Sequence, residues 1–215
     1  MLLVAHRTPR SRAACEVLAA AGARVFEADI QVDDQHRIVV SHYLPMGDWL
    51  QRDNWRVRWH TSAAHDPTLD DVVALVPSGC RVSLDIKERT DEGRRRLIDA
   101  LIAGFSDRSR FVVCGGREPD LERLRAAGFR TWRSAGRPAQ LRELLAQGPL
   151  HDDAVSVRHS LLTPDVVARL HQQVATVVAW TVNDLRRARR VREFGVDGIT
   201  TDRPAVLRML ASAGT

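Results

Sequence analysis

The chain has 215 residues, of which 44% are hydrophobic and 27% charged, and it carries a net charge of +5 at pH 7. This balance excludes a disordered chain, and no apolar run approaches the roughly 20 residues that a membrane-spanning helix needs. The three cysteines, Cys15, Cys80 and Cys114, are odd in number and widely spaced, which argues against a disulfide scaffold or zinc ribbon and for a reducing compartment. We therefore expect one globular domain over residues 1–215, located in the cytoplasm and without a transmembrane segment.

The basic balance also invites a nucleic-acid-binding interpretation. The densest basic cluster, five arginines between residues 186 and 192, lies on a predicted helix without interleaved aromatic residues and beside Asp184 and Glu193. Arginine is used along the whole chain, so this cluster is typical of a solvated helix face. We expect no nucleic-acid partner, and a basic nucleic-acid-binding protein stays the weakest alternative.

Short β-rich runs alternate with helical stretches along the chain. The predicted strands cover residues 2–6, 24–32, 81–87, 110–115, 130–134, 154–157, 175–182 and 197–201. The predicted helices cover 12–21, 68–76, 92–105, 119–127, 139–146, 164–173, 184–194 and 204–211. Helix C-caps are expected at Gly22, Gly128, Gly148 and Gly195, and helix starts at Pro119, Pro138, Pro164 and Pro204. Eight strands that are each followed by a helix predict an α/β fold of the (β/α)8 TIM barrel type. A doubly wound open sheet competes, but no Gly-x-Gly-x-x-Gly follows the first strand.

One insertion follows the second predicted strand. Residues 33–35 read as a turn and residues 38–40 as a returning strand. Residues 43–65 then form a short insert, expected to be irregular, in which Trp49, Trp55 and Trp59 alternate with arginines. This pattern suits a lid, a substrate wall or a plug over the barrel mouth, and the sequence does not separate these roles.

Lys87 is the one lysine among the 32 basic residues of the chain. In a chain that uses arginine almost everywhere, it indicates a place that needs a compact ammonium rather than a planar guanidinium. Asp85 and Lys87 are two residues apart, so in a strand they share one face, with Leu84 and Ile86 on the other. Chance retention of a lysine in a salt bridge is the alternative.

Three carboxylates are predicted to meet inside the barrel. In the second strand, Phe26, Ala28 and Ile30 suit the face under the helices, so Glu27 and Asp29 share the inward face. The next barrel strand adds Asp85. Unpaired buried carboxylates are costly, and a divalent cation removes that cost, so the pattern predicts a Mg²⁺ or Ca²⁺ site. Salt-bridged carboxylates are the alternative.

Two histidines are predicted at the same mouth of the barrel. His6 ends the first strand and His42 follows the returning strand after the second. Polar residues at the carboxyl ends of barrel strands face the catalytic side. Two imidazoles beside a metal-bound phosphate supply a general base and a general acid near neutral pH.

These residues together resemble the glycerophosphodiester phosphodiesterases and the related sphingomyelinase D-type phospholipase D toxins. The resemblance covers nearly the whole chain, and its specificity lies in the order and spacing of short motifs. In chain order they are His6-Arg7, Glu27-x-Asp29, His42, Pro67-Thr68-Leu69-Asp70-Asp71, Asp85-Ile86-Lys87, Trp180-Thr181-Val182-Asn183 and the closing stretch from Gly195 to Pro204.

The chain departs from the family pattern at several positions. Thr8 stands where a glycine usually follows His-Arg, and Tyr43 stands where an aspartate usually follows the second histidine. Asp85 stands where the phosphodiesterases usually carry glutamate and where the toxin branch carries aspartate. The insert, however, lacks the cysteines of the toxins. These changes affect the glycerol side of the site and leave the expected reacting groups in place.

The resemblance implies a metal-dependent phosphodiesterase that cleaves a small-molecule glycerophosphodiester to glycerol phosphate and an alcohol. A phospholipase D-like lyase that releases a cyclic phosphate from lipid headgroups is one alternative, and a catalytically silent barrel that binds phosphorylated ligands is another. The implied roles are one divalent cation held by Glu27, Asp29 and Asp85; catalysis by His6 as acid, His42 as base and Lys87; phosphate binding by Arg7; and packing against the alcohol by Trp180.

Overall fold

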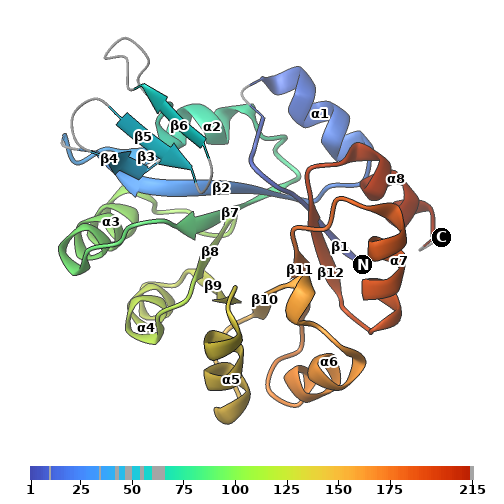
Figure 1. The fold of residues 1–215 in the computed structure, drawn as a ribbon. Helices are drawn as coiled ribbons and strands as arrows, with labels where there is room; N and C mark the ends of the chain where they lie inside the picture. Colours follow the sequence, from blue (N-terminus) through green and yellow to red (C-terminus); the bar gives the residue numbers. More distant parts are fainter. Residues whose placement is uncertain are drawn as a thin grey trace.

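The computed structural model describes residues 1–9, 11–33, 35–41, 44–46, 50–53, 56–59 and 66–213, with backbone alone for 44–46, 50–53 and 56–59. In this described part of the chain, eight parallel strands form a closed barrel inside a ring of eight helices (Figure 1). The first strand pairs in parallel with both the second and the last, which closes the sheet. The predicted (β/α)8 TIM barrel is confirmed.

The elements follow the expected order. The barrel strands are Leu2–Ala5 (β1), Val25–Val32 (β2), Arg81–Ile86 (β7), Phe111–Gly115 (β8), Arg130–Ala135 (β9), Ala154–Arg158 (β10), Val177–Trp180 (β11) and Gly198–Thr201 (β12). The helices are Arg12–Ala20 (α1), Leu69–Leu75 (α2), Asp91–Gly104 (α3), Glu118–Ala126 (α4), Pro138–Ala146 (α5), Pro164–His171 (α6), Leu185–Glu193 (α7) and Pro204–Ser212 (α8), with a 3-10 turn at His159–Leu161 (η1). No helix among the described residues has the length and apolar character required to cross a bilayer.

Side-chain alternation divides each barrel strand between two environments. Phe26, Ala28 and Ile30 of β2 lie in the apolar layer between sheet and helices. The inward side chains include a second, smaller apolar cluster: Val4, Val25, Val112, Cys114, Trp132, Ala154 and Val178. Because the period of a strand is two residues, the next inward positions lie nearer the carboxyl ends and form the mouth of the barrel.

Local sequence signals explain where the helices begin and end. Side chains of Ser11, Thr90 and Thr163 cap the first turns of α1, α3 and α6, and Pro138, Pro164 and Pro204 stand in the first turns of α5, α6 and α8. Gly22, Gly128 and Gly195 have φ angles of +109°, +88° and +93°, which side chains rarely adopt. The predicted cap at Gly148 is wrong: the cap of α5 is the extended Gln147, so no left-handed residue is needed there.

The insertion after β2 is more regular than expected. Ile38–Val40 (β3) returns antiparallel to β2, as predicted. The expectation of an irregular insert is wrong for its backbone, because Leu44–Met46 (β4), Leu50–Asp53 (β5) and Arg56–Trp59 (β6) pair as a small antiparallel sheet beside the barrel (Figure 1). Trp49 and Trp55 lie outside the described residues, so the role of the tryptophans stays a prediction.

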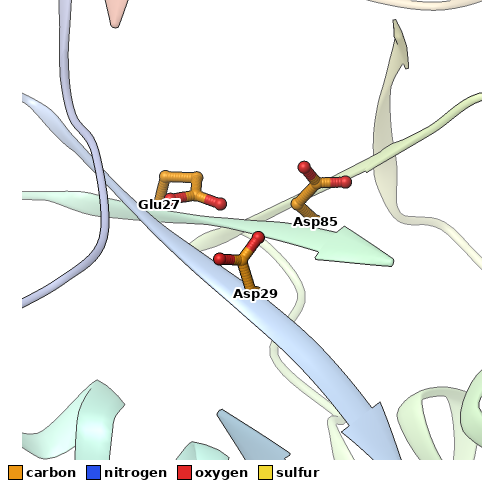
Figure 2. A group of neighbouring side chains, drawn as sticks. All are labelled: Glu27, Asp29 and Asp85. Atoms are coloured by element: carbon orange, nitrogen blue, oxygen red, sulfur yellow. The ribbon is translucent and has the colours of Figure 1, made fainter. Parts of the chain in front are cut away.

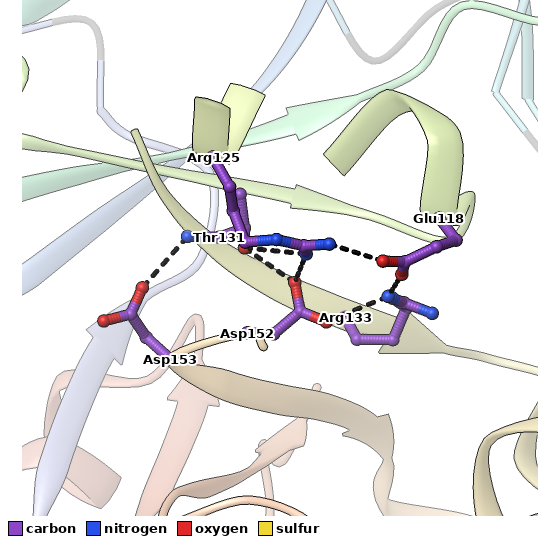
Figure 3. A network of polar contacts seen from close by, with 6 residues as sticks. All are labelled: Glu118, Arg125, Thr131, Arg133, Asp152 and Asp153. Carbon is purple, nitrogen blue, oxygen red and sulfur yellow. Dashed lines mark hydrogen bonds and ion pairs between the residues drawn. The ribbon is translucent and has the colours of Figure 1, made fainter. Parts of the chain in front are cut away.

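A buried ion network joins α4, β9 and the segment before β10 (Figure 3). The side chain of Asp152 has 0% exposure and accepts hydrogen bonds from Arg125, Arg133 and Thr131 at 2.7, 2.9 and 2.6 Å. Both arginines also pair with Glu118 on α4. These groups lie on the helix side of β9, away from the barrel mouth, and they hold α4 against the sheet.

Candidate active site

Three carboxylates from two adjacent strands meet at the mouth of the barrel (Figure 2). Glu27 and Asp29 project inward from β2, and Asp85 projects inward from β7. Asp29 and Asp85 are direct partners in the parallel register, and one oxygen of each of the three carboxylates lies within 4.8 Å of the others. The alternation that places apolar side chains under the helices therefore gathers the acidic side chains inside.

Burial and mutual repulsion disfavour the charged forms of these carboxylates. Glu27 and Asp29 are 7% and 4% exposed. Burial, followed by the charges of Asp29 and Asp85, raises the pKa of Glu27 well above its usual range. Burial also raises the pKa of Asp85, against the lowering effect of Lys87. Such a cluster is stable in its charged form only beside compensating positive charge.

Lys87 supplies part of that charge. Its Nζ lies 2.6 Å from Oδ2 of Asp85 and 2.9 Å from Oδ1 of Asp29. Although burial opposes it, the charges of Asp85, Asp29 and Glu27 raise the pKa of Lys87, so it stays an ammonium. Lys87 is one positive charge in contact with this cluster of three described carboxylates. An all-oxygen donor set suits a hard divalent cation, so Glu27, Asp29 and Asp85 fit a metal site.

His6 is held by a hydrogen-bond chain that begins on β12. Its Nδ1 lies 2.6 Å from Oδ1 of Asp202, and Nδ2 of Asn183 donates to Oδ2 of the same carboxylate at 2.5 Å. Asn183 is fixed in turn, because its Oδ1 accepts from the Asp202 amide and the Thr201 hydroxyl. Burial raises the pKa of Asp202, but the hydrogen bonds from His6 and Asn183 outweigh it and lower the pKa below its usual value. The carboxylate therefore stays charged and orients the ring, which leaves Nε2 for chemistry.

The turn after β1 connects His6 to the carboxylates. The Arg7 amide donates to Oε2 of Glu27 at 2.8 Å, and both the amide and the hydroxyl of Thr8 donate to the Glu27 carbonyl, at 2.7 and 2.8 Å. Arg7 has a φ angle of +55°, an uncommon value for a residue with a side chain. Thr8 thus gives the turn an extra hydrogen bond that the glycine common in the family does not offer.

A cavity of about 570 Å³ opens over these groups. His6, Arg7, Glu27, Asp85, Lys87 and Trp180 line it, so it joins most of the predicted site residues. Cys114 also lines it, but burial raises the pKa of its thiol well above the usual value, which argues against a thiolate nucleophile. Trp180, at the end of β11, forms part of the wall next to Gly136.

Two features of the site stand apart from the sequence predictions. His42 lies outside the described residues, so its role as base stays a prediction. Asp202 and Asn183 belong to motifs quoted for the family resemblance, and the structure adds their contact with His6, which the sequence does not predict. Strand alternation offered a signal for Asp202, because it lies two residues beyond the inward Thr200 and next to His6 across the β1–β12 pair.

Comparisons with known proteins agree with this geometry. The model of the glycerophosphoryl diester phosphodiesterase family matches residues 115–206, a range that holds Trp180, Asn183 and Asp202 but begins after the carboxylates. No curated protein sequence matches the chain.

Several solved structures share the fold over essentially the whole chain. A Silicibacter pomeroyi protein to which glycerophosphoryl diester phosphodiesterase activity has been attributed is 20% identical, with a TM-score of 0.76 over 100% of this chain and 94% of that one. An Oleispira antarctica phosphodiesterase, solved in complex with the product sn-glycerol-3-phosphate, is 13% identical, with a TM-score of 0.73 over 100% and 97%. A Parabacteroides distasonis glycerophosphodiester phosphodiesterase is 20% identical, with a TM-score of 0.71 over 100% and 98%.

At these identities the structural likeness shows the barrel, and the family model adds the match over its carboxyl-terminal half. Two of the motifs quoted from the sequence, Trp180-Thr181-Val182-Asn183 and the stretch from Gly195 to Pro204, lie within the matched range. Over residues 115–206 the chain is therefore similar to the glycerophosphoryl diester phosphodiesterase family.

Proposed function

We propose that the protein hydrolyses glycerophosphodiesters to glycerol phosphate and an alcohol, with one divalent cation, Mg²⁺ or Ca²⁺, at Glu27, Asp29 and Asp85. The observation that carries the proposal is that Glu27, Asp85, Lys87 and the Asp202-held His6 line one cavity, with Asp29 in contact range of the other two carboxylates. The Oleispira relative supports the substrate class, because it was solved with sn-glycerol-3-phosphate. The free cysteines of the chain, all three of them buried, are in keeping with an enzyme of the cytoplasm.

The side chains of this chain have separate tasks in the proposed reaction. Lys87 and Arg7 bind the non-bridging oxygens of the phosphodiester, Lys87 as a point charge and Arg7 as a planar fork. When bound, the cation stabilises the negative charge that develops on the phosphoryl group. Trp180 packs against the organic part of the substrate at the cavity wall.

Proton transfer is assigned to the two histidines. His42 takes the proton of the attacking water as its oxygen bonds to phosphorus. The bond from phosphorus to the alcohol oxygen then breaks, and His6 donates a proton from Nε2 to that oxygen. Asp202 holds the Nδ1 side of the ring at 2.6 Å, so the donating nitrogen keeps its orientation toward the cavity.

A substrate panel followed by phosphorus NMR tests the proposal. Glycerophosphodiesters and lysophospholipids are incubated with Mg²⁺ or Ca²⁺, and with chelator. We expect glycerol phosphate to form from glycerophosphodiesters only when a cation is present, and Glu27→Gln to be inactive. A cyclic phosphate as the end product would instead favour the lyase. Absence of turnover across the panel would favour a silent phosphate-binding barrel.

A further inference from the structure

The cavity extends well beyond the carboxylates. From β2 and β7 it continues over the ends of β8 and β9, where Gly116, Ser134 and Gln140 line it. Gly116 has no side chain that could fill this part of the cavity. A phosphodiester bound at Lys87 therefore has space beside it for the second substituent of the phosphate.

Two arginines border this extension from opposite sides. Arg89 follows β7, Arg137 follows β9, and both are exposed at the rim and line the cavity. Within the described part of the chain, no carboxylate is ion-paired with either guanidinium, whereas Arg94 on α3 and Arg117 before α4 both pair with Asp91. The carboxylates that line the cavity, Glu27 and Asp85, belong to the cluster around Lys87.

The loops that carry these arginines are fixed. The guanidinium of Arg94 donates to the carbonyls of Glu88 and Arg89, at 3.2 and 2.8 Å. The side-chain oxygen of Gln140 accepts from the amides of Gly136 and Arg137, both at 3.0 Å. The two guanidinium groups therefore start from held backbone positions, and ordering them around a ligand costs less entropy than it would on free loops.

The charges exceed what a single phosphodiester requires. With a divalent cation bound, as the proposed function has it, the charges of the cation, Lys87 and Arg7 would balance those of the three carboxylates and of the phosphodiester. Arg89 and Arg137 add two further positive charges over the space next to it. Guanidinium groups without a carboxylate partner among the described residues favour carboxylate or phosphate and oppose a cationic headgroup.

We propose that Arg89 and Arg137 form a subsite for a second anionic group, so that the preferred substrate is a glycerophosphodiester whose alcohol carries a phosphate or carboxylate. This inference rests on the proposed function and adds the substrate class to it. Phosphate and carboxylate share the recognition chemistry, so esters of both kinds are compared in the test.

The experiment compares kcat/KM for matched glycerophosphodiesters whose alcohol is choline, glycerol, glycolate or glycerol bearing a terminal phosphate. We expect the anionic esters to be cleaved best and the choline ester least. The double substitution Arg89→Gln, Arg137→Gln should lower kcat/KM for the anionic esters about tenfold, mainly through KM, because charge-assisted hydrogen bonds are lost at an exposed rim. The glycerol ester should change less than about twofold, within the effect of a surface substitution.

Arg142→Gln is the matched control. Arg142 is an exposed arginine of α5 that does not line the cavity, so its removal changes net charge without changing the subsite. We expect it to leave the ratio of anionic to neutral turnover unchanged. Two results would contradict the subsite and leave the proposed function in place. One is an equal loss of kcat/KM on all esters in the double variant, and the other is a preference of the wild-type protein for the choline ester.

A second readout separates the two proposals. If no ester is cleaved, the proposed function fails, and the same esters are titrated into the wild-type and double-variant proteins by calorimetry. Tighter binding of the anionic esters that is lost in the double variant would support the subsite alone. Equal binding of all esters, or no binding, would overturn it.

Discussion

The ammonium of Lys87 lies between carboxylates that come from different strands. Its contacts of 2.6 and 2.9 Å join Asp85 of β7 to Asp29 of β2. A small group with three rotatable donors reaches both oxygens and still faces the cavity, where its side chain is 31% exposed. This geometry gives a physical reason for the one lysine in a chain that otherwise uses arginine.

We predict that Lys87→Arg lowers turnover on the order of 10²-fold or more, the range seen when one electrostatic donor leaves a preorganised site. The guanidinium is wider and planar, so it pairs with Asp85 or displaces the phosphate instead of bridging the two carboxylates. The measurement is kcat and KM on a glycerophosphodiester, with the melting temperature as a control for folding. Near-normal turnover would show that any cation suffices at this position.

We predict that Asp202→Asn lowers kcat for natural esters about 10- to 100-fold, the usual cost of losing an orienting partner of a functional histidine. The amide conserves size but no longer holds the Nδ1 side of His6 as a charged acceptor. KM should change little, because Asp202 contacts His6 and Asn183 rather than the substrate space.

The nitrophenyl ester of glycerol phosphate tests whether Asp202 acts through proton donation. Nitrophenolate leaves without a proton, so loss of an oriented acid should slow its release far less than that of an alkoxide. Equal losses on the two substrates would contradict the assignment of His6 as the acid. Asn183→Ala serves as a matched variant, because it removes the hydrogen bonds between Asn183 and Asp202 but keeps the carboxylate that contacts His6.

The inward carboxylates and Lys87 could be predicted from residue types because strand alternation alone places them. Asp202 was harder to predict, since its partner His6 lies 196 residues away in the chain and the pair exists only when β12 closes against β1. The subsite for a second anionic group could not be predicted from the sequence for a related reason. Arg89 and Arg137 look like ordinary surface arginines until their two loops are placed over one cavity.

At the scale of elements, α4 packs on β9 through charges as well as apolar contacts. Leu121 and Leu124 are the buried apolar residues of α4, and next to them the Asp152 network joins the helix to the strand (Figure 3). A buried carboxylate that accepts three hydrogen bonds is costly to remove, because its arginine partners stay buried without it.

We predict that Asp152→Ala lowers the free energy of unfolding by about 3–5 kcal/mol, the range for breaking a buried ion pair from one side. Asp153→Ala is the matched control: its side chain is 44% exposed and accepts one hydrogen bond, from the Thr131 amide, so we expect a loss of about 1 kcal/mol. Denaturant titration followed by circular dichroism measures both. Similar losses in the two variants would contradict the role given to burial.

Element order followed from the sequence because strands, caps and turns each left a local signal. The φ angles of Gly22, Gly128 and Gly195 match the predicted helix ends, whereas Gly148 follows a helix that ends in extended backbone at Gln147. The pairing of β4, β5 and β6 left a weak signal in the sequence, because Gly47 stands between β4 and β5 and the segment alternates arginine with apolar residues.

At the scale of the whole molecule, charge is distributed unevenly between surface and mouth. The arginines of α7 lie on a helix whose buried residues are Ala188 and Val191, which agrees with a solvated outer face. The barrel mouth instead concentrates acidic groups from β2 and β7 on its inner wall. Folding without a cation therefore brings together like charges that the unfolded chain keeps apart.

Our last prediction is that Glu27→Gln has opposite effects on stability with and without a divalent cation. In chelator, the change removes one of three mutually repelling carboxylates, so the free energy of unfolding should rise, on the order of 1 kcal/mol. The amide oxygen of glutamine can still accept the hydrogen bond from the Arg7 amide, so the turn after β1 should keep its geometry.

With Mg²⁺ or Ca²⁺ at about 100 times its dissociation constant, the free energy of unfolding of the wild-type protein should rise by about 2.7 kcal/mol, because the cation binds only the folded chain. This corresponds to a rise of roughly 5 to 10 °C in melting temperature. Glu27→Gln should gain much less, since one charged ligand is missing. Thermal melts of both proteins, in chelator and across a cation titration, measure without any substrate whether the order of their stabilities reverses. Asp70→Asn on α2, an acidic residue outside the carboxylate cluster, should respond to cations like the wild type. Parallel shifts in the Glu27→Gln and wild-type proteins would place cation binding elsewhere in the molecule.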